Sequence, residues 1–83
     1  MIKCADKELV IAKLLSQGAE RREGLDSDTS LWFCVWMEGK RISFCIPQPL
    51  VDGGYTEGQL AVIENEIVPF DLELLPMDPH LIH

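Results

Sequence analysis

The second half of this 83-residue chain lacks both lysine and arginine. Residues 1–41 contain seven basic and seven acidic side chains, whereas residues 42–83 contain seven acidic side chains and no basic one, so the whole formal charge of −7 belongs to the second half. Proteins that bind nucleic acid neutralise its phosphates with lysine and arginine. The composition therefore argues against direct nucleic-acid binding and favours a partner protein with a basic surface.

Cysteine is scarce, and Cys4, Cys34 and Cys45 form neither an even set nor a C-x-x-C pair. This pattern argues against the disulfide framework of a secreted protein and favours a reducing compartment. No apolar run approaches the roughly 18 residues that span a bilayer, and no signal segment opens the chain. We therefore expect a cytoplasmic protein that does not bind membranes.

Motifs for catalysis and cofactor binding are also missing. The chain has no G-x-x-x-x-G-K-[ST] phosphate loop, and its two histidines, His80 and His83, lie in a terminal segment with no rigid element to present them to a cysteine. The cysteines lack the close spacing of a structural zinc site. We predict a protein without catalytic residues, bound metal or cofactor.

Apolar side chains make up 47% of the chain and charged ones 25%, which is typical of a globular domain. Apolar spacing predicts one helix over about residues 6–17, which Asp6 can cap, and a second over 57–67. Thr56 and Gln59 form a T-x-x-Q capping box at the start of the second helix. The expected core faces of the two helices comprise Val10, Ile11, Leu14, Leu15, Leu60, Ile63 and Ile67.

Two runs of aromatic and β-branched residues predict a β-hairpin over 31–46, with its turn near Glu38-Gly39-Lys40. A two-residue turn, at Glu38-Gly39 or at Gly39-Lys40, directs Trp32 and Trp36 away from the expected core residues Phe33, Val35, Ile42, Phe44 and Ile46. A Gly39-Lys40 turn would also place Cys34 opposite Cys45. A three-residue turn with a bulge would move both tryptophans to the side of Ile42, Phe44 and Ile46.

Residues 70–74 alternate apolar with acidic side chains and predict a short edge strand near the C-terminus. Residues 19–25 are compatible with an edge strand or with a frayed end of the first helix. The expected fold is therefore an α+β domain over 1–76, with a small antiparallel sheet, made of the central hairpin 31–46 and the C-terminal edge strand, packed against two helices. We expect residues 77–83 to form an extended or mobile tail.

The first functional hypothesis is a non-catalytic inhibitor or adaptor that docks on a basic surface of a partner protein. Known inhibitors that work in this way, including some that bacteriophages encode, cover a nucleic-acid-binding surface of their partner with carboxylates. The acidic residues assigned to this surface are Glu57, Glu64, Glu66, Asp71 and Glu73.

The alternative hypothesis starts from the strand over 31–37, which is apolar on both faces. One of these faces is either covered by the chain itself or available to a partner. Trp32, Trp36 and Arg41 would then form the contact of a structural protein that self-associates as a homodimer.

Overall fold

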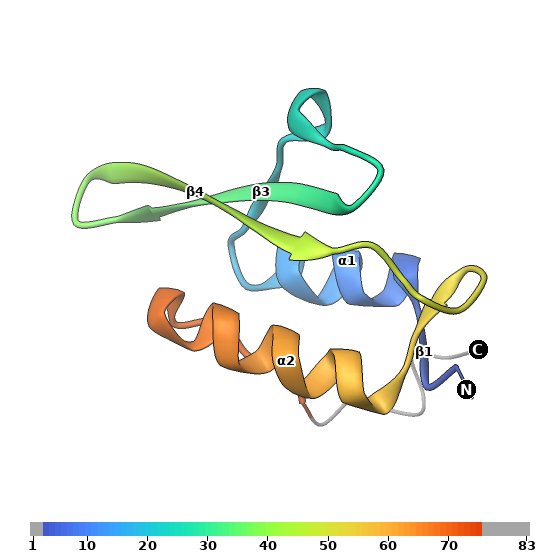
Figure 1. Ribbon diagram of the computed structural model, residues 1–83. Helices are drawn as coiled ribbons and strands as arrows, with labels where there is room; N and C mark the ends of the chain where they lie inside the picture. Colours follow the sequence, from blue (N-terminus) through green and yellow to red (C-terminus); the bar gives the residue numbers. More distant parts are fainter. Residues whose placement is uncertain (1–2, 76–83) are drawn as a thin grey trace.

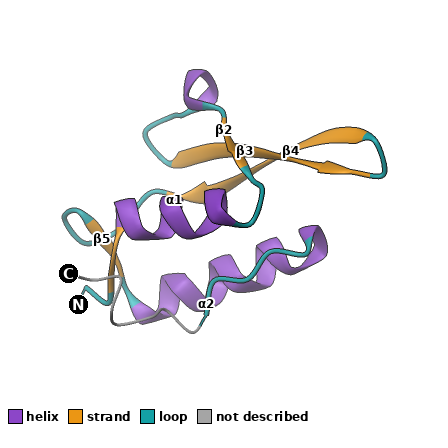
Figure 2. Cartoon of the chain, turned by 180° about the vertical axis from the view of Figure 1, so that it is seen from behind, coloured by secondary structure: helices purple, strands orange, loops and turns teal. Residues whose placement is uncertain are grey.

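The computed structural model describes residues 3–75, which form two layers, one of antiparallel strands and one of two helices (Figure 1). Both helices lie on the same side of the long hairpin (Figure 2). This arrangement confirms the predicted α+β fold. The elements in chain order are β1 (Ala5–Asp6), α1 (Lys7–Ser16), β2 (Glu20–Arg21), the 3-10 turn η1 (Glu23–Leu25), β3 (Ser30–Met37), β4 (Lys40–Pro47), β5 (Gly54–Tyr55), α2 (Glu57–Ile67) and the 3-10 turn η2 (Val68–Phe70).

The hairpin of β3 and β4 turns at Glu38-Gly39, one of the two-residue alternatives. Both turn residues have positive φ, 53° at Glu38 and 78° at Gly39, as a type I′ turn requires. The ladder runs from Met37 opposite Lys40 to Ser30 opposite Pro47 without a bulge. In this register Cys34 pairs with Ser43 rather than with Cys45.

The third strand of the sheet is β2, which pairs with Cys34 and Phe33 at the other edge of β3. The edge strand predicted over 70–74 is wrong, because Phe70 ends η2 and the chain after it has no strand partner among the described residues. Of the two interpretations of residues 19–25, the edge strand is the one adopted, over two residues only. A separate two-stranded sheet joins β1 to β5.

The alternating pattern of the segment after η2 corresponds to burial of its leucines and not to a β-strand. Leu72 and Leu74 are buried in the core, while side chains of the helices take the place of a neighbouring strand. Gln17, which caps the end of α1, accepts a hydrogen bond from the N–H of Glu73 and donates one to its carbonyl oxygen. The alternation therefore predicted burial correctly, but a side-chain amide supplied the hydrogen bonds that were expected from a β-strand.

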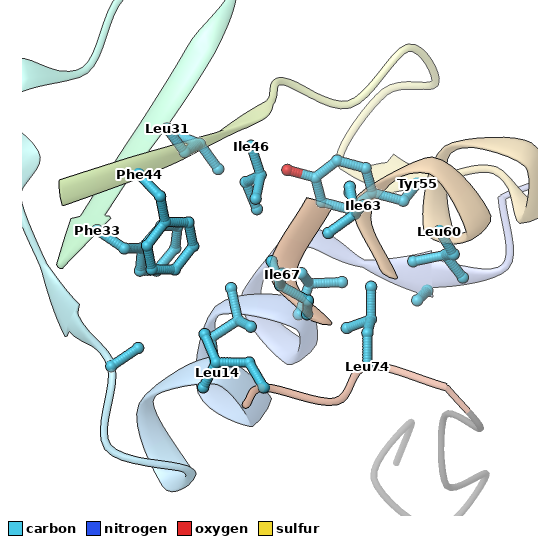
Figure 3. Close-up of a cluster of buried hydrophobic side chains, with 14 of the residues drawn as sticks. Leu14, Leu31, Phe33, Phe44, Ile46, Tyr55, Leu60, Ile63, Ile67 and Leu74 are labelled. Atoms are coloured by element: carbon cyan, nitrogen blue, oxygen red, sulfur yellow. The ribbon is translucent and has the colours of Figure 1, made fainter. Parts of the chain in front are cut away.

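The core lies between the hairpin and the helices, and Figure 3 shows Leu14, Phe33, Ile63 and Leu74 converging on it. An aromatic row runs from the sheet face to η2, with ring centroids 5.6 Å apart for Phe33 and Phe44 and 5.0 Å apart for Phe44 and Phe70. All predicted core residues are buried or half-buried except one. That exception is Leu15, which is 41% exposed. It follows Leu14, so it is turned about 100° around α1 away from the core face.

The capping box of α2 is confirmed, because the Thr56 side chain accepts from the Gln59 N–H and the Gln59 side chain accepts from the Thr56 N–H. The predicted cap at Asp6 is wrong, because no backbone amide of α1 donates to its side chain. Its carboxylate instead accepts a hydrogen bond from Lys3, at 2.6 Å. Asp6 still begins the helix as an extended residue, so the boundary was predicted from the right residue but for the wrong contact.

A carboxylate fixes the loop between β2 and β3. Asp26 accepts two hydrogen bonds from the Arg21 guanidinium, at 3.1 and 2.7 Å, and one from the Trp32 N–H, at 2.8 Å. These bonds favour the ionised form, so they hold the pKa of Asp26 below its usual range. Arg21 also stacks over the Phe33 ring, with its central carbon 5.0 Å from the ring centroid. The loop is therefore tied to the same sheet residue that anchors the aromatic row.

Tyr55 is the single tyrosine of the chain, and its ring is fully buried between the hairpin and α2. Its hydroxyl donates to the Pro47 carbonyl oxygen at 2.7 Å, and burial raises its pKa to about 12. Because the folded state resists deprotonation, the stability that Tyr55 contributes is complete below about pH 10 and is lost as the pH rises toward 12. We expect the near-ultraviolet tyrosinate absorbance of the folded protein to appear well above pH 10.

Tyr55→Phe removes both the titrating group and the hydrogen bond. We expect it to be about 1 kcal/mol less stable than the wild type at neutral pH in urea denaturation. We also expect its stability to decline less steeply above about pH 10. Tyrosinate absorbance that appears near pH 10 while the protein is still folded would contradict this description of the core.

Candidate binding site

The face of the hairpin that points away from the helices carries the three residues of the predicted aromatic contact. In the observed register Trp36 lies opposite Arg41, and Trp32 lies opposite Cys45. Trp36 is 60% exposed and Trp32 is half-buried. The indole N–H of Trp36 donates to Glu20 at 3.0 Å, and Arg41 donates to the Cys34 thiol at 3.3 Å. The structure therefore brings these three side chains onto one face, with Trp36 as its exposed aromatic residue.

The five acidic residues predicted to face a partner do not share a single face. Glu64, Asp71 and Glu73 line one hollow of about 240 Å³ beside α2. Glu57 is seven residues before Glu64, so it lies on the same side of the helix, whereas Glu66 is nine residues after Glu57 and lies about 180° away. The acidic surface beside α2 thus consists of four of the five residues.

Glu64 differs from the other four, because its carboxylate is used within the fold. One of its oxygens accepts hydrogen bonds from the N–H groups of Leu74 and Leu75, at 2.7 and 2.9 Å. This contact holds the segment after η2 against α2, together with the contact between Gln17 and Glu73. The side chain that was assigned to a partner therefore also stabilises the position of Glu73.

A second hollow, of about 480 Å³, lies below the hairpin tip, and we call it the tip hollow. Three segments of the chain line it. They are the end of β3 with the turn, the residues after α1 and the residues around the end of η2. Trp36 and Asp71 both line it, so the aromatic and the acidic sets that were predicted separately meet here. Glu38 also lines it, although its sequence position predicted only a place in the turn.

Glu38 and Asp71 are the non-glycine residues with positive φ in the described part of the chain, at 53° and 59°. Glu38 takes this conformation in the type I′ turn, and Asp71 takes it as the left-handed residue that ends η2. Aspartate tolerates this region better than most residues do. The two turns therefore place both acidic residues at the tip hollow, and the E-G dipeptide was the sequence signal for one of them.

The edge of β3 beside the tip hollow is open. The pairing of β2 with β3 ends at Glu20 opposite Cys34, and Trp36 lies beyond it with no strand partner on this edge among the described residues. Gly18, with φ of 103°, turns the chain between α1 and β2 and lines the same hollow. The hollow therefore exists because β2 is short and the chain diverges from β3 before the hairpin tip.

Two basic residues of the first half, Lys3 and Arg21, pair with acidic residues of the same half. The ion pairs found among residues 3–75 are Lys3 with Asp6 and Arg21 with Asp26. Neither involves Glu38, Asp71 or the acidic residues of α2. These two pairs therefore leave the negative charge of the tip hollow and of the surface beside α2 unchanged.

The described residues contain no group of three or more cysteine, histidine, aspartate or glutamate side chains arranged to hold a metal ion. His80 and His83 lie outside these residues, as does the tail predicted over 77–83. Neither α1 nor α2, the helices within 3–75, is long and apolar enough to cross a membrane.

Comparison of the chain with protein-family models, with curated proteins and with solved structures finds no match. We therefore infer the function of this chain from its own geometry.

We expect the contact between Glu64 and the segment after η2 to stabilise the fold. Glu64→Ala leaves the N–H groups of Leu74 and Leu75 without their acceptor, and we expect it to lower the free energy of unfolding by roughly 1–3 kcal/mol. Urea denaturation measures the change, and hydrogen exchange should speed up at these two amides. The matched control is Glu66→Ala on the exposed side of α2, which should change stability by less than about 0.5 kcal/mol. Equal effects of the two substitutions would refute the role given to Glu64.

Proposed function

We propose that this protein is a non-catalytic binding protein that docks on a basic surface of a partner protein, and that the tip hollow receives a lysine or arginine side chain of that partner. The observation that carries the proposal is the gathering of Trp36, Glu38 and Asp71 around one hollow. An exposed indole and two carboxylates are the groups that recognise an organic cation.

The wall of the tip hollow suits the rest of such a side chain as well. Met37 and Phe70 line it, and both are half-buried apolar residues. Lysine and arginine carry an apolar stem that packs along such surfaces while the charged end reaches polar groups. A cation that enters the hollow would therefore contact apolar atoms along its stem and carboxylates at its end.

The acidic surface beside α2 supports the same proposal over a longer range. Asp71 lines both the tip hollow and the hollow that it shares with Glu64 and Glu73, so the two negative regions are continuous. A continuous negative region attracts a basic surface during encounter and repels acidic proteins. We therefore place the partner across both hollows, with the cationic side chain as its anchor.

A partner whose basic surface binds nucleic acid fits this arrangement, because carboxylates would then lie where phosphates otherwise bind. Small acidic inhibitors of this kind, including those encoded by bacteriophages, act by occlusion and need no catalytic residue. The scarce cysteines, which form neither an even set nor a C-x-x-C pair, fit a reducing, cytoplasmic setting for this activity.

The tip hollow can be tested with a short peptide that alternates arginine with alanine. We expect it to shift the NMR signals of the Trp36 indole and of the Gly18, Glu38 and Asp71 amides. The same peptide with citrulline in place of arginine keeps the shape but loses the charge, and it should leave these signals in place. Because exposed ion pairs are screened by salt, the affinity of the arginine peptide should fall as ionic strength rises.

Variants that remove carboxylates can identify which acidic residues bind the arginine peptide. Glu38→Gln combined with Asp71→Asn keeps the shape of both turns and should weaken the arginine peptide roughly 3- to 10-fold, as expected for the loss of two partly exposed ion pairs. The matched control, Glu8→Gln combined with Glu23→Gln, removes the same charge at exposed positions that do not line the hollow, and it should change the affinity less than twofold. Equal binding of the arginine and citrulline peptides, or equal effects of the two double variants, would refute the proposal.

A further inference from the structure

The outer edge of β4 has no partner strand in the described structure, because the sheet order is β2-β3-β4. Trp32 shows which backbone groups point outward: its N–H donates to Asp26 and its carbonyl oxygen accepts from the Arg22 N–H, both away from β4. Antiparallel pairs alternate, so Cys45, the residue opposite Trp32, also points its backbone groups away from the ladder. The same alternation directs the N–H and carbonyl groups of Arg41 and Ser43 outward.

This edge is long and regular. All eight residues of β4 pair one-to-one with β3, without a bulge. Lys40 and Arg41 lie at one end and Pro47 at the other, but residues 42–46 contain neither a charge nor a proline. Ser43, at the centre of this stretch, is exposed. Charges, prolines and bulges are the means by which proteins protect an open edge, so the centre of β4 is unprotected.

We propose that β4 pairs antiparallel with β4 of a second copy of this chain, around a two-fold axis at Ser43. The outward backbone groups then meet in register, with Ser43 opposite Ser43 of the second copy and Arg41 opposite Cys45. Ile42 comes opposite Phe44 on the side that faces the helices. Ile42 is half-buried in the single chain, so the pairing removes apolar surface from water in addition to forming backbone hydrogen bonds.

Charge favours a second copy at this edge over one at any of the acidic surfaces. The chain carries −7 in total, so most approaches bring carboxylates together. Residues 29–51, which contain the whole hairpin, carry two basic side chains and one acidic one, for a local charge of +1. Two copies can therefore meet along the hairpin edge without joining their negative regions.

This pairing is separate from the proposed function. The tip hollow lies at the edge of β3, on the far side of the sheet from the outer edge of β4. A dimer joined through β4 leaves both hollows open. Failure of the pairing would not affect the binding of the arginine peptide, and failure of peptide binding would not affect the pairing.

The test is Ser43→Pro. In the single chain the Ser43 N–H points to solvent, so proline removes no bond between β3 and β4 and is tolerated at such an edge position. In the pair it removes the two central N–H donors, one from each copy. Sedimentation velocity over a concentration series should show a reversible dimer for the wild type and a dissociation constant roughly 10- to 100-fold higher for Ser43→Pro. Ser43→Thr keeps the N–H and should dimerise like the wild type.

Hydrogen exchange on the wild type gives a result that does not depend on a variant. The amides of Arg41, Ser43 and Cys45 should become protected as the protein concentration rises, whereas the Trp36 amide should not. A wild type that sediments as a monomer at every concentration would overturn the proposal, whether or not another protein pairs with the edge. A dimer that Ser43→Pro leaves intact would overturn it as well.

Discussion

The turn at Glu38-Gly39 is the constraint on which the rest of the structure depends. It sets the register of β3 against β4, and a shift by one residue would exchange the faces of a strand. With this turn, Phe33 and Phe44 stack on the side of the helices and Trp36 lies on the other side opposite Arg41. The same turn holds Glu38 in a left-handed conformation at the tip hollow. One local choice therefore determines the core, the exposed aromatic face and part of the candidate site.

Elements with a local physical cause could be predicted from the sequence. The capping box at Thr56, the apolar spacing of 57–67 and the two strands around the glycine turn depend on residues that are close in the chain. The segment after η2 shows the limit of this approach. Its alternating pattern indicated burial of Leu72 and Leu74, but the hydrogen-bonding partner of Glu73 is Gln17, 56 residues away. No pattern within the segment distinguishes a strand neighbour from a side-chain amide of a helix.

The candidate site could be predicted in its parts but not in its arrangement. Trp36 and Asp71 were singled out for different reasons, as an aromatic contact and as part of the acidic half. Their meeting in one hollow depends on where β2 stops and on how η2 ends, and both are set by tertiary packing. The same packing draws Glu64 into the fold and leaves Glu66 on the other side of α2. The distribution of charge along the chain thus indicated an acidic surface, but it did not indicate which acidic residues lie together on that surface.

The hairpin register can be measured by NMR, through contacts between α-protons of residues that face each other across the two strands. We predict contacts that pair Trp36 with Arg41, Cys34 with Ser43 and Trp32 with Cys45, because these are the closely spaced pairs of the observed ladder. Contacts that pair Val35 with Phe44 would show a turn at Gly39-Lys40 instead. That result would contradict the observed ladder and the left-handed conformation of Glu38 at the tip hollow.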